Sequence, residues 1–133
     1  MSHTTEGPVG EGPVGEVSIR TIAMPADTNP AGDIFGGWLM SQMDLAGGTF
    51  ARYRAHGRVA TIAVDGFSFH RPVFVGDELT CYCTEERRGK TSITVRVAAW
   101  VRRGDTGEQA QVTEGLFTFV AIDDNRRKRM LSE

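Results

Sequence analysis

The chain has 133 residues, of which 40% are hydrophobic and 24% charged, and its formal net charge is −2. A chain of this length forms one domain that buries most of its apolar surface. The balanced charge excludes a basic nucleic-acid coat, and the sequence lacks the run of about 18 apolar residues that a membrane span needs. Because the first residues also lack the charged start and apolar core of a secretion signal, we expect a cytoplasmic protein whose partners are neither nucleic acids nor membranes.

The two ends of the chain differ in composition from the part between them. Residues 6–15 repeat Glu-Gly-Pro-Val-Gly twice, and glycine and proline oppose both helix and strand. We therefore predict a disordered Gly/Pro-rich tail over residues 1–14 and a folded domain over residues 15–124. Residues 125–133 form a basic C-terminal tail, for which a solvated end and an anionic partner are both open.

The folded part begins with a strand over residues 17–22 and a turn-rich loop over residues 24–32. A helix of about 19 residues follows Gly37 and ends near Gly57, which suits a left-handed C-terminal cap. Its apolar stripe consists of Leu39, Met43, Ala46 and Phe50.

The second half of the chain is rich in β-formers. Strands are predicted over residues 59–69, 78–85, 91–101 and 109–122, with a bulge at Gly66 and turns at 87–90 and 103–107. The apolar face of the sheet has to be buried against another element, and the single apolar helix is the element that the sequence provides for this. The predicted fold class is α+β, a hotdog fold in which an antiparallel sheet wraps around one long central helix.

The cysteines and histidines do not predict a metal site. Cys81 and Cys83 stand two apart in a strand, where they point to the same face and are badly placed to bridge each other. Two cysteines and three scattered histidines provide no ligand cluster. We expect two reduced, buried thiols and no bound metal.

One acid in the helix is placed for chemistry. Asp44 has Met40, Gly47, Gly48 and Ala51 as its neighbours on the helix surface. A charge among small residues is costly unless something pairs with it or uses it. Asp44 is therefore the first candidate for a catalytic residue.

Four stretches of the chain carry a resemblance to a known family. They are Met24-Pro-Ala-Asp-Thr-Asn-Pro-Ala-Gly-Asp-Ile-Phe-Gly-Gly-Trp-Leu-Met-Ser-Gln-Met-Asp44, residues 56–61, residues 72–77 and residues 117–123. Together they closely resemble the YciA-type acyl-CoA thioesterases of the hotdog superfamily, over about residues 17–124. His70-Arg71 departs from that family's usual pattern before Pro72.

The resemblance implies an enzyme that splits acyl-CoA into a carboxylic acid and coenzyme A. It assigns the catalytic acid to Asp44, as general base or nucleophile, and a second catalytic role to Asn29 in the loop. It also implies a homodimer in which Asp44 and Asn29 of one site come from opposite subunits, assembled further into a trimer of dimers. Coenzyme A enters as part of the substrate and leaves as product, and no other cofactor is implied.

The residue chemistry supports these expectations. Gly36 and Gly37 lie at the helix start, where unpaired amides and the positive end of the dipole offer an oxyanion site. The phosphates of coenzyme A require cations, for which the candidates are Arg58, Arg71, Arg87, Arg88 and Lys90. The acyl-chain length depends on which of Trp38, Met40, Phe67 and Phe69 line the tunnel.

Three other readings remain open. A hotdog dehydratase needs a histidine in the loop before the helix, where this chain has none. A non-catalytic acyl-CoA-binding module is the main alternative, since it needs the fold and the cations without Asp44. The third reading is a structural oligomer without a ligand. In that case close subunit packing has to offset the roughly 0.5–1 kcal/mol by which Gly47 and Gly48 each weaken the helix.

Overall fold

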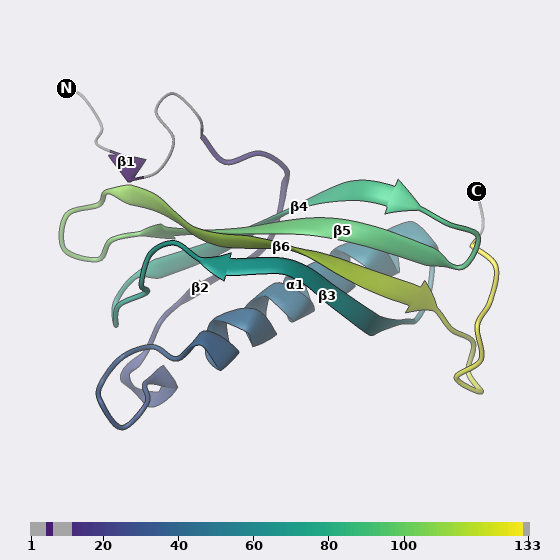
Figure 1. The fold of residues 1–133 in the computed structure, drawn as a ribbon, viewed down its shortest axis with the longest axis horizontal. Coiled ribbons are helices and arrows are strands. Elements are labelled where there is room, and N and C mark those ends of the chain that lie inside the picture. The colour runs from purple at the N-terminus through teal and green to yellow at the C-terminus, as the bar shows by residue number, and fades with distance from the viewer. Residues whose placement is uncertain (1–4, 7–11, 132–133) are drawn as a thin grey trace.

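A computed structural model describes residues 5–6 and 12–131 of the chain (Figure 1). Within these residues the elements are, in order, β1 (Thr5–Glu6), β2 (Glu16–Ile22), the 3-10 turn η1 (Pro25–Asp27), α1 (Gly36–Ala55), β3 (Val59–Phe69), β4 (Glu78–Arg88), β5 (Ser92–Arg102) and β6 (Gln109–Ala121). The predicted order of strand, loop, long helix and strand meander is thus confirmed.

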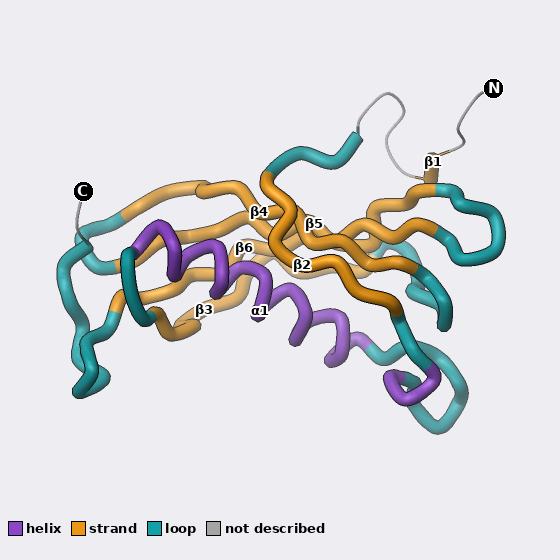
Figure 2. The backbone as a smooth tube through the Cα atoms, turned by 180° about the vertical axis from the view of Figure 1, so that it is seen from behind, coloured by secondary structure: helices purple, strands orange, loops and turns teal. Residues whose placement is uncertain are grey.

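The strands form one sheet around a single long helix. β3, β6, β5, β4 and β2 lie side by side in that order with antiparallel pairing, and β1 adds two residues paired parallel to β6. Figures 1 and 2 show α1 running along one face of this curved sheet. The fold is α+β with the hotdog arrangement that the sequence predicts.

The helix is held by its apolar stripe. Leu39, Met43, Ala46 and Phe50 are all buried, and they pack against alternate residues of β4, β5 and β6 in one core. Each fully buried large side chain contributes about 1.5–3 kcal/mol, so this stripe fixes the rotation of α1 about its axis. No helix in the described part of the chain is long and apolar enough to cross a membrane.

β3 is the edge strand that matters most for the site. Its neighbour within the described chain is β6, and none of its residues is buried. The predicted bulge at Gly66 is confirmed, because the register shifts between Asp65 and Ser68 and Gly66 has a φ of 65°. Ile62 on this strand is 58% exposed. β3 thus combines an exposed apolar side chain with an edge that has no partner strand within the described chain.

The turn predicted at residues 87–90 is wrong in its position. Arg87 and Arg88 belong to β4 and pair with Thr94 and Ile93 of β5, after a bulge between Glu85 and Arg87. The Arg88 guanidinium lies 2.9 Å from Glu85, so the two basic residues extend the strand. The reversal of the chain is confined to the residues between Arg88 and Ser92.

The end of the helix also differs from the prediction. The residue in the left-handed conformation is His56, with φ 54° and ψ 42°, rather than Gly57. A Cβ at Gly57 would lie 2.7 Å from the Arg129 guanidinium. Gly57 therefore makes room for the C-terminal segment instead of forming the cap itself.

The C-terminal basic run lies against the domain at one residue. Arg129 donates from Nη2 to the Ala55 carbonyl at 3.0 Å and from Nε to the Ile122 carbonyl at 3.0 Å. The bond to Ala55 satisfies a carbonyl at the end of α1. Arg129 is therefore bound to the domain and does not belong to a fully solvated end. Most of the predicted tail over residues 1–14 lies outside the described residues.

Candidate functional site

Asp44 lies in the middle of α1 and is half-buried. Its Oδ1 accepts a 2.7 Å hydrogen bond from the Thr61 hydroxyl on β3, and no basic side chain of the described residues forms an ion pair with it. The carboxylate is therefore held by a neutral donor on one oxygen. Its second oxygen remains available for chemistry.

A hollow of about 460 Å³ opens in front of Asp44. It lies between α1 and the start of β3 and is lined by Asp44, Leu45, Gly48, Thr49, Arg52, Arg58, Val59, Thr61 and Phe119. Its volume is in the range of small-molecule sites. Of the cations predicted to hold phosphates, Arg58 is the one that shares this hollow with Asp44.

Two further residues of this hollow escaped the sequence prediction. Arg52 continues the i, i+4 row that begins at Asp44 and Gly48, so helical spacing alone could have identified it. Thr61 carries no such signal, because its contact with Asp44 depends on how β3 crosses α1.

Gly36 and Gly37 begin the helix, after Phe35 as its N-cap. The first helical bonds run from the amides of Trp38 and Leu39 to the Phe35 carbonyl, so the amides of both glycines precede the helical hydrogen-bond ladder. A Cβ at Gly36 would lie 3.1 Å from the Phe69 ring. The space that the glycine leaves is thus bordered by this chain's own Phe69.

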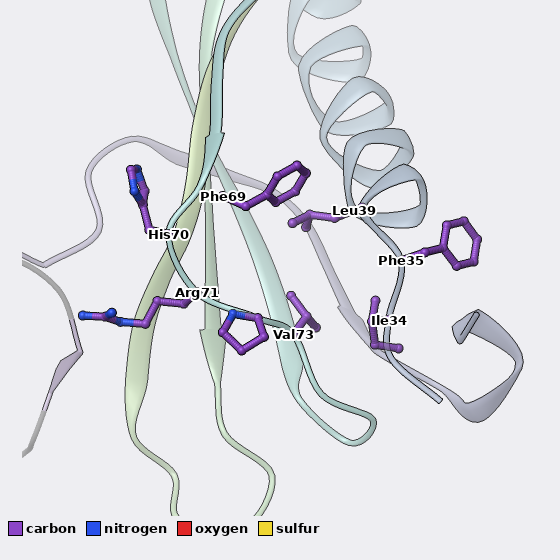
Figure 3. A pocket seen from close by; sticks show the side chains of 9 residues that line it. Ile34, Phe35, Leu39, Phe69, His70, Arg71 and Val73 are labelled. Carbon is purple, nitrogen blue, oxygen red and sulfur yellow. The ribbon is translucent and has the colours of Figure 1, made fainter. Parts of the chain in front are cut away.

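A second hollow, of about 490 Å³, lies beside Gly36 (Figure 3). Its lining is mainly apolar and consists of Ile34, Phe35, Gly36, Leu39, Phe69, His70, Arg71, Pro72 and Val73. Figure 3 shows Phe69, Leu39 and Ile34 directed towards the space, whereas the side chains of His70 and Arg71 extend away from it. Of the four side chains predicted to line an acyl tunnel, Phe69 borders this hollow.

Asn29 shapes the loop before the helix. Its Oδ1 accepts the amides of Ala31 at 3.0 Å and Asp33 at 3.1 Å, an arrangement that asparagine commonly makes in turns. Its side-chain nitrogen makes no hydrogen bond with the described residues. Asn29 lines neither hollow, so a single chain does not bring it together with Asp44.

The remaining predicted cations are dispersed. Arg71 borders the hollow near the helix start, at the opposite end of β3 from Arg58. The Arg88 guanidinium is hydrogen-bonded to Glu85 and lowers the pKa of that carboxyl. The pKa of Glu86 is lowered chiefly by its hydrogen bond from Arg96, and the charge of Arg87 is a minor cause. Lys90 lies in the β4–β5 turn. One chain does not gather the predicted cations into one site.

No group of three or more histidine, cysteine, aspartate or glutamate side chains suited to a metal ion occurs in residues 12–131. Cys81 and Cys83 are both buried free thiols, as predicted from their spacing.

Comparison with known proteins identifies the family. The Thioesterase superfamily profile matches residues 31–108. The Escherichia coli K12 acyl-CoA thioester hydrolase YciA is 48% identical over 134 residues, covering 98% of each chain. The corresponding YciA protein of Salmonella typhimurium is 50% identical over 116 residues, covering 85% of this chain and 87% of that protein.

Solved structures agree with this match. A hexameric broad-specificity acyl-coenzyme A thioesterase superimposes with a TM-score of 0.92 at 44% identity, covering 98% of this chain and 89% of that one. A variant of the same enzyme, with an aspartate replaced by alanine, has also been solved. A hexameric thioesterase of Yersinia pestis gives a TM-score of 0.87 at 50% identity, covering 91% of this chain and 98% of that one. The chain therefore belongs to the YciA-type acyl-CoA thioester hydrolases of the thioesterase superfamily.

Proposed function

We propose that the chain hydrolyses acyl-CoA to a carboxylic acid and free coenzyme A, with Asp44 as the catalytic acid–base or nucleophilic group. The observation that carries the proposal is the half-buried Asp44 carboxylate, which borders a hollow and is hydrogen-bonded by the neutral hydroxyl of Thr61. A carboxylate that is not held in an ion pair keeps an oxygen for proton transfer or for attack on a substrate. Family membership supplies the substrate class.

Two routes fit this carboxylate. As a general base, Asp44 takes a proton from water while the oxygen of that water attacks the thioester carbonyl. The C–S bond then breaks, and the departing thiolate receives the proton from Asp44. As a nucleophile, Asp44 attacks the carbonyl itself, the C–S bond breaks, and coenzyme A leaves as its thiolate while the acyl group stays on Asp44 as an anhydride. Water then opens the anhydride, which releases the carboxylic acid and restores the Asp44 carboxylate, and the proton lost from the water goes to the thiolate.

The oxyanion of either route needs hydrogen-bond donors. The amides of Gly36 and Gly37 are at the positive end of α1 and outside its hydrogen-bond ladder, which suits them to this role. Gly36 borders the apolar hollow, and neither glycine borders the hollow of Asp44. We therefore infer that the two halves of the proposed site come from different chains.

A homodimer formed along β3 provides that combination. Two copies of β3 that pair antiparallel about a twofold axis place the Phe69 end of one strand beside the Val59 end of the other. Phe69 contacts Gly36, and Val59 and Thr61 border the hollow of Asp44. The pairing thus brings the helix start and the Asn29 loop of one subunit towards Asp44 of its partner.

Asn29 completes the proposed site from the partner subunit. Its oxygen is occupied by the loop, whereas its amide nitrogen is free to donate to the attacking water or to the thioester oxygen. Because its relatives in solved structures are hexameric, we propose a trimer of such dimers. The reaction as proposed needs no cofactor, and the two free thiols fit a reducing cytoplasm.

The test is release of coenzyme A from acyl-CoAs of increasing chain length, by the wild type and by Asp44→Asn. We expect the substitution to lower kcat by about 10²–10⁴-fold while circular dichroism and oligomeric state stay unchanged. Near-normal turnover by Asp44→Asn would remove Asp44 from the mechanism. Binding of acyl-CoA by a folded wild type without release of coenzyme A would instead establish a non-catalytic binding module.

A further inference from the structure

A buried ion pair joins two connections at one end of the sheet. Asp77, directly before β4, and Arg103, directly after β5, are 2% and 8% exposed, and Arg103 Nη1 lies 2.7 Å from Asp77 Oδ2. Figure 1 shows the β5–β6 turn and the segment that follows β3 at this same end. A buried ion pair gains little stability over well-packed apolar side chains of similar volume. Its presence here is therefore better explained by the geometry that it imposes.

The pair organises the connection between β3 and β4. Arg103 Nη1 donates to the Pro72 carbonyl at 2.9 Å, and the Phe74 amide donates to Asp77 Oδ2 at 2.8 Å. These two groups belong to the peptide units on either side of Val73. Because a peptide unit is planar and both units are held, the pair fixes the backbone of Val73 and the direction of its side chain.

Val73 is part of the hollow beside Gly36. Its side chain is 6% exposed and belongs to the core, and it borders that hollow together with Ile34 and Leu39. In Figure 3, Val73 and Ile34 reach the space from two different segments, the connection after β3 and the loop before α1. A change in the direction of the Val73 side chain therefore changes the width of the hollow.

The turn after β5 fixes the position of Arg103. The Arg103 amide donates to the Glu108 carbonyl at 2.8 Å, and the Gly104 amide donates to Asp77 Oδ1 at 3.2 Å. A Cβ at Gly104 would lie 2.6 Å from the Gly76 carbonyl oxygen, so the two connections are in close backbone contact. The guanidinium of Arg103 therefore extends from a backbone that is itself held in place.

The backbone beside the pair also holds the start of the loop before α1. The Ala23 amide donates to the Asp77 carbonyl at 2.9 Å, and the Gly76 amide donates to the Ala23 carbonyl at 2.8 Å. Ala23 is fully buried and directly precedes the loop that carries Asn29 and Ile34. The two segments that border the hollow are thus both attached next to Asp77.

We propose that Asp77 and Arg103 are positioning residues, which set the width of the hollow beside Gly36 through Val73 and so determine which acyl chains the enzyme prefers. The inference rests on the proposed function, which places the thioester oxygen at the amides of Gly36 and Gly37 and brings the acyl chain next to this hollow. Neither charged side chain borders the hollow, so the pair acts through Val73. One methylene group more or less in an apolar pocket changes kcat/KM by about 10–200-fold, so a small displacement of Val73 is enough to alter the preference.

The experiment measures kcat and KM for acetyl-CoA and for longer straight-chain acyl-CoAs. The variants of the pair are Arg103→Lys, which keeps the charge on a shorter side chain, and Asp77→Asn, which keeps the shape without the charge. Val73→Ala leaves the pair intact and removes the methyl groups that border the hollow. The matched controls are Arg102→Lys and Glu78→Gln, which change the more exposed ion pair of the same two strands, where Arg102 Nε lies 3.6 Å from Glu78.

The measured quantity is the ratio of kcat/KM for the best longer acyl-CoA to kcat/KM for acetyl-CoA. We expect the variants of the pair and Val73→Ala to lower this ratio by about tenfold, because acetyl presents the smallest apolar surface to the hollow. The controls should keep the wild-type ratio. A purely structural role has a different signature, since loss of folded protein lowers kcat by one factor for every acyl chain and leaves each KM and the ratio unchanged.

Two results would overturn the proposal. One is a folded Arg103→Lys variant with the wild-type ratio, and the other is a Val73→Ala variant with that ratio. If Asp77→Asn does not fold, because it leaves a buried charge uncompensated, Arg103→Lys alone decides.

Failure of the proposed function gives a separate result, because the wild type then hydrolyses none of the acyl-CoAs. Calorimetric affinities for the same acyl-CoAs decide about the pair in that case. A dependence of affinity on chain length that is weaker in Arg103→Lys supports the positioning role, and an unchanged dependence refutes it.

Discussion

Two adjacent glycines in α1 have different structural surroundings. A Cβ at Gly47 would lie 3.1 Å from both the Phe119 ring and a Val97 methyl group, whereas a Cβ at Gly48 would meet only the Phe119 ring, at 3.5 Å. Gly47 thus allows the helix to approach the sheet. Gly48 has ordinary room around it and borders the hollow of Asp44.

This difference predicts stability changes of opposite sign. Gly47→Ala should lower the free energy of unfolding by about 1–3 kcal/mol, because the core is overpacked. Gly48→Ala should raise it by about 0.5–1 kcal/mol, because alanine favours the helix. Urea denaturation of both variants at one fixed protein concentration measures the two values, and equal destabilisation would show that Gly48 is as closely packed as Gly47.

For single residues, the sequence could predict a role only where the neighbours on the same helix indicated one. Asp44 stood out because its neighbours on the helix surface are uncharged and mainly small, and the structure places it at a hollow. Thr61 could not be found, because no local pattern encodes the crossing of β3 over α1. Gly47 was noticed for its cost to the helix, but its cause, the Phe119 ring, lies in a strand far along the chain.

Among the elements, β3 has an open edge and exposed apolar side chains. Ile62 and Val64 are 58% and 39% exposed, and the strand has β6 as its partner within the described chain. Open strand edges with apolar side chains readily pair with another chain. The proposed dimer uses this edge.

A charge on that edge should therefore separate the subunits. We expect Ile62→Lys to shift the protein towards smaller species and to lower activity, because lysine on an edge strand opposes edge-to-edge pairing. Val14→Lys is the matched control, since Val14 is 75% exposed and precedes β2. Sedimentation velocity resolves the species; an unchanged assembly in Ile62→Lys would place the subunit contact elsewhere.

The predicted boundaries of helices and strands agree with the structure where the local sequence pattern determines them. β3 has the predicted bounds, Val59–Phe69, because β-formers continue to its end and Gly66 permits the bulge. β4 runs further than predicted because Arg87 and Arg88, which look like turn residues, pair with β5 across the ladder. The helix cap moved to His56 because Gly57 is needed beside Arg129, more than 70 residues later in the chain.

At the scale of the whole molecule, the two buried thiols make the free energy of unfolding depend on pH in the alkaline range. Burial, with the neighbouring Cys83, raises the pKa of Cys81 from 9.0 to about 12. Burial, with Glu16 nearby, also raises the pKa of Cys83 from 9.0 to about 12, against an opposing hydrogen bond from Ser18. Between pH 9 and 12 the unfolded chain releases these protons and the folded chain keeps them, so stability present below pH 9 is lost as the pH rises.

Replacing both thiols should remove that part of the alkaline loss. We expect the melting temperature of the wild type to fall more steeply above pH 9 than that of Cys81→Ala/Cys83→Ala, while the cavity cost of the substitutions is the same at every pH. Thermal melts from pH 7 to the alkaline limit of refolding measure both curves. Parallel curves would mean that the thiols ionise in the folded protein.

The proposed site is complete only when two chains assemble. Asp44 and Arg58 border one hollow, whereas Gly36 borders another and Asn29 shapes the loop before it. We propose that two chains combine these parts, so that each site takes Asp44 from one subunit and Asn29 from the other. Two variants that are each inactive should then restore activity when their subunits assemble together.

The most direct measurement is therefore turnover of an acyl-CoA by a mixed assembly of Asp44→Asn and Asn29→Ala subunits, co-expressed and purified through separate tags. Each mixed dimer contains one site with both wild-type residues, so random pairing should restore about one quarter of wild-type activity, although each variant alone is inactive. No activity above that of the separate variants, in an assembly shown to contain both subunits, would contradict a site shared between chains.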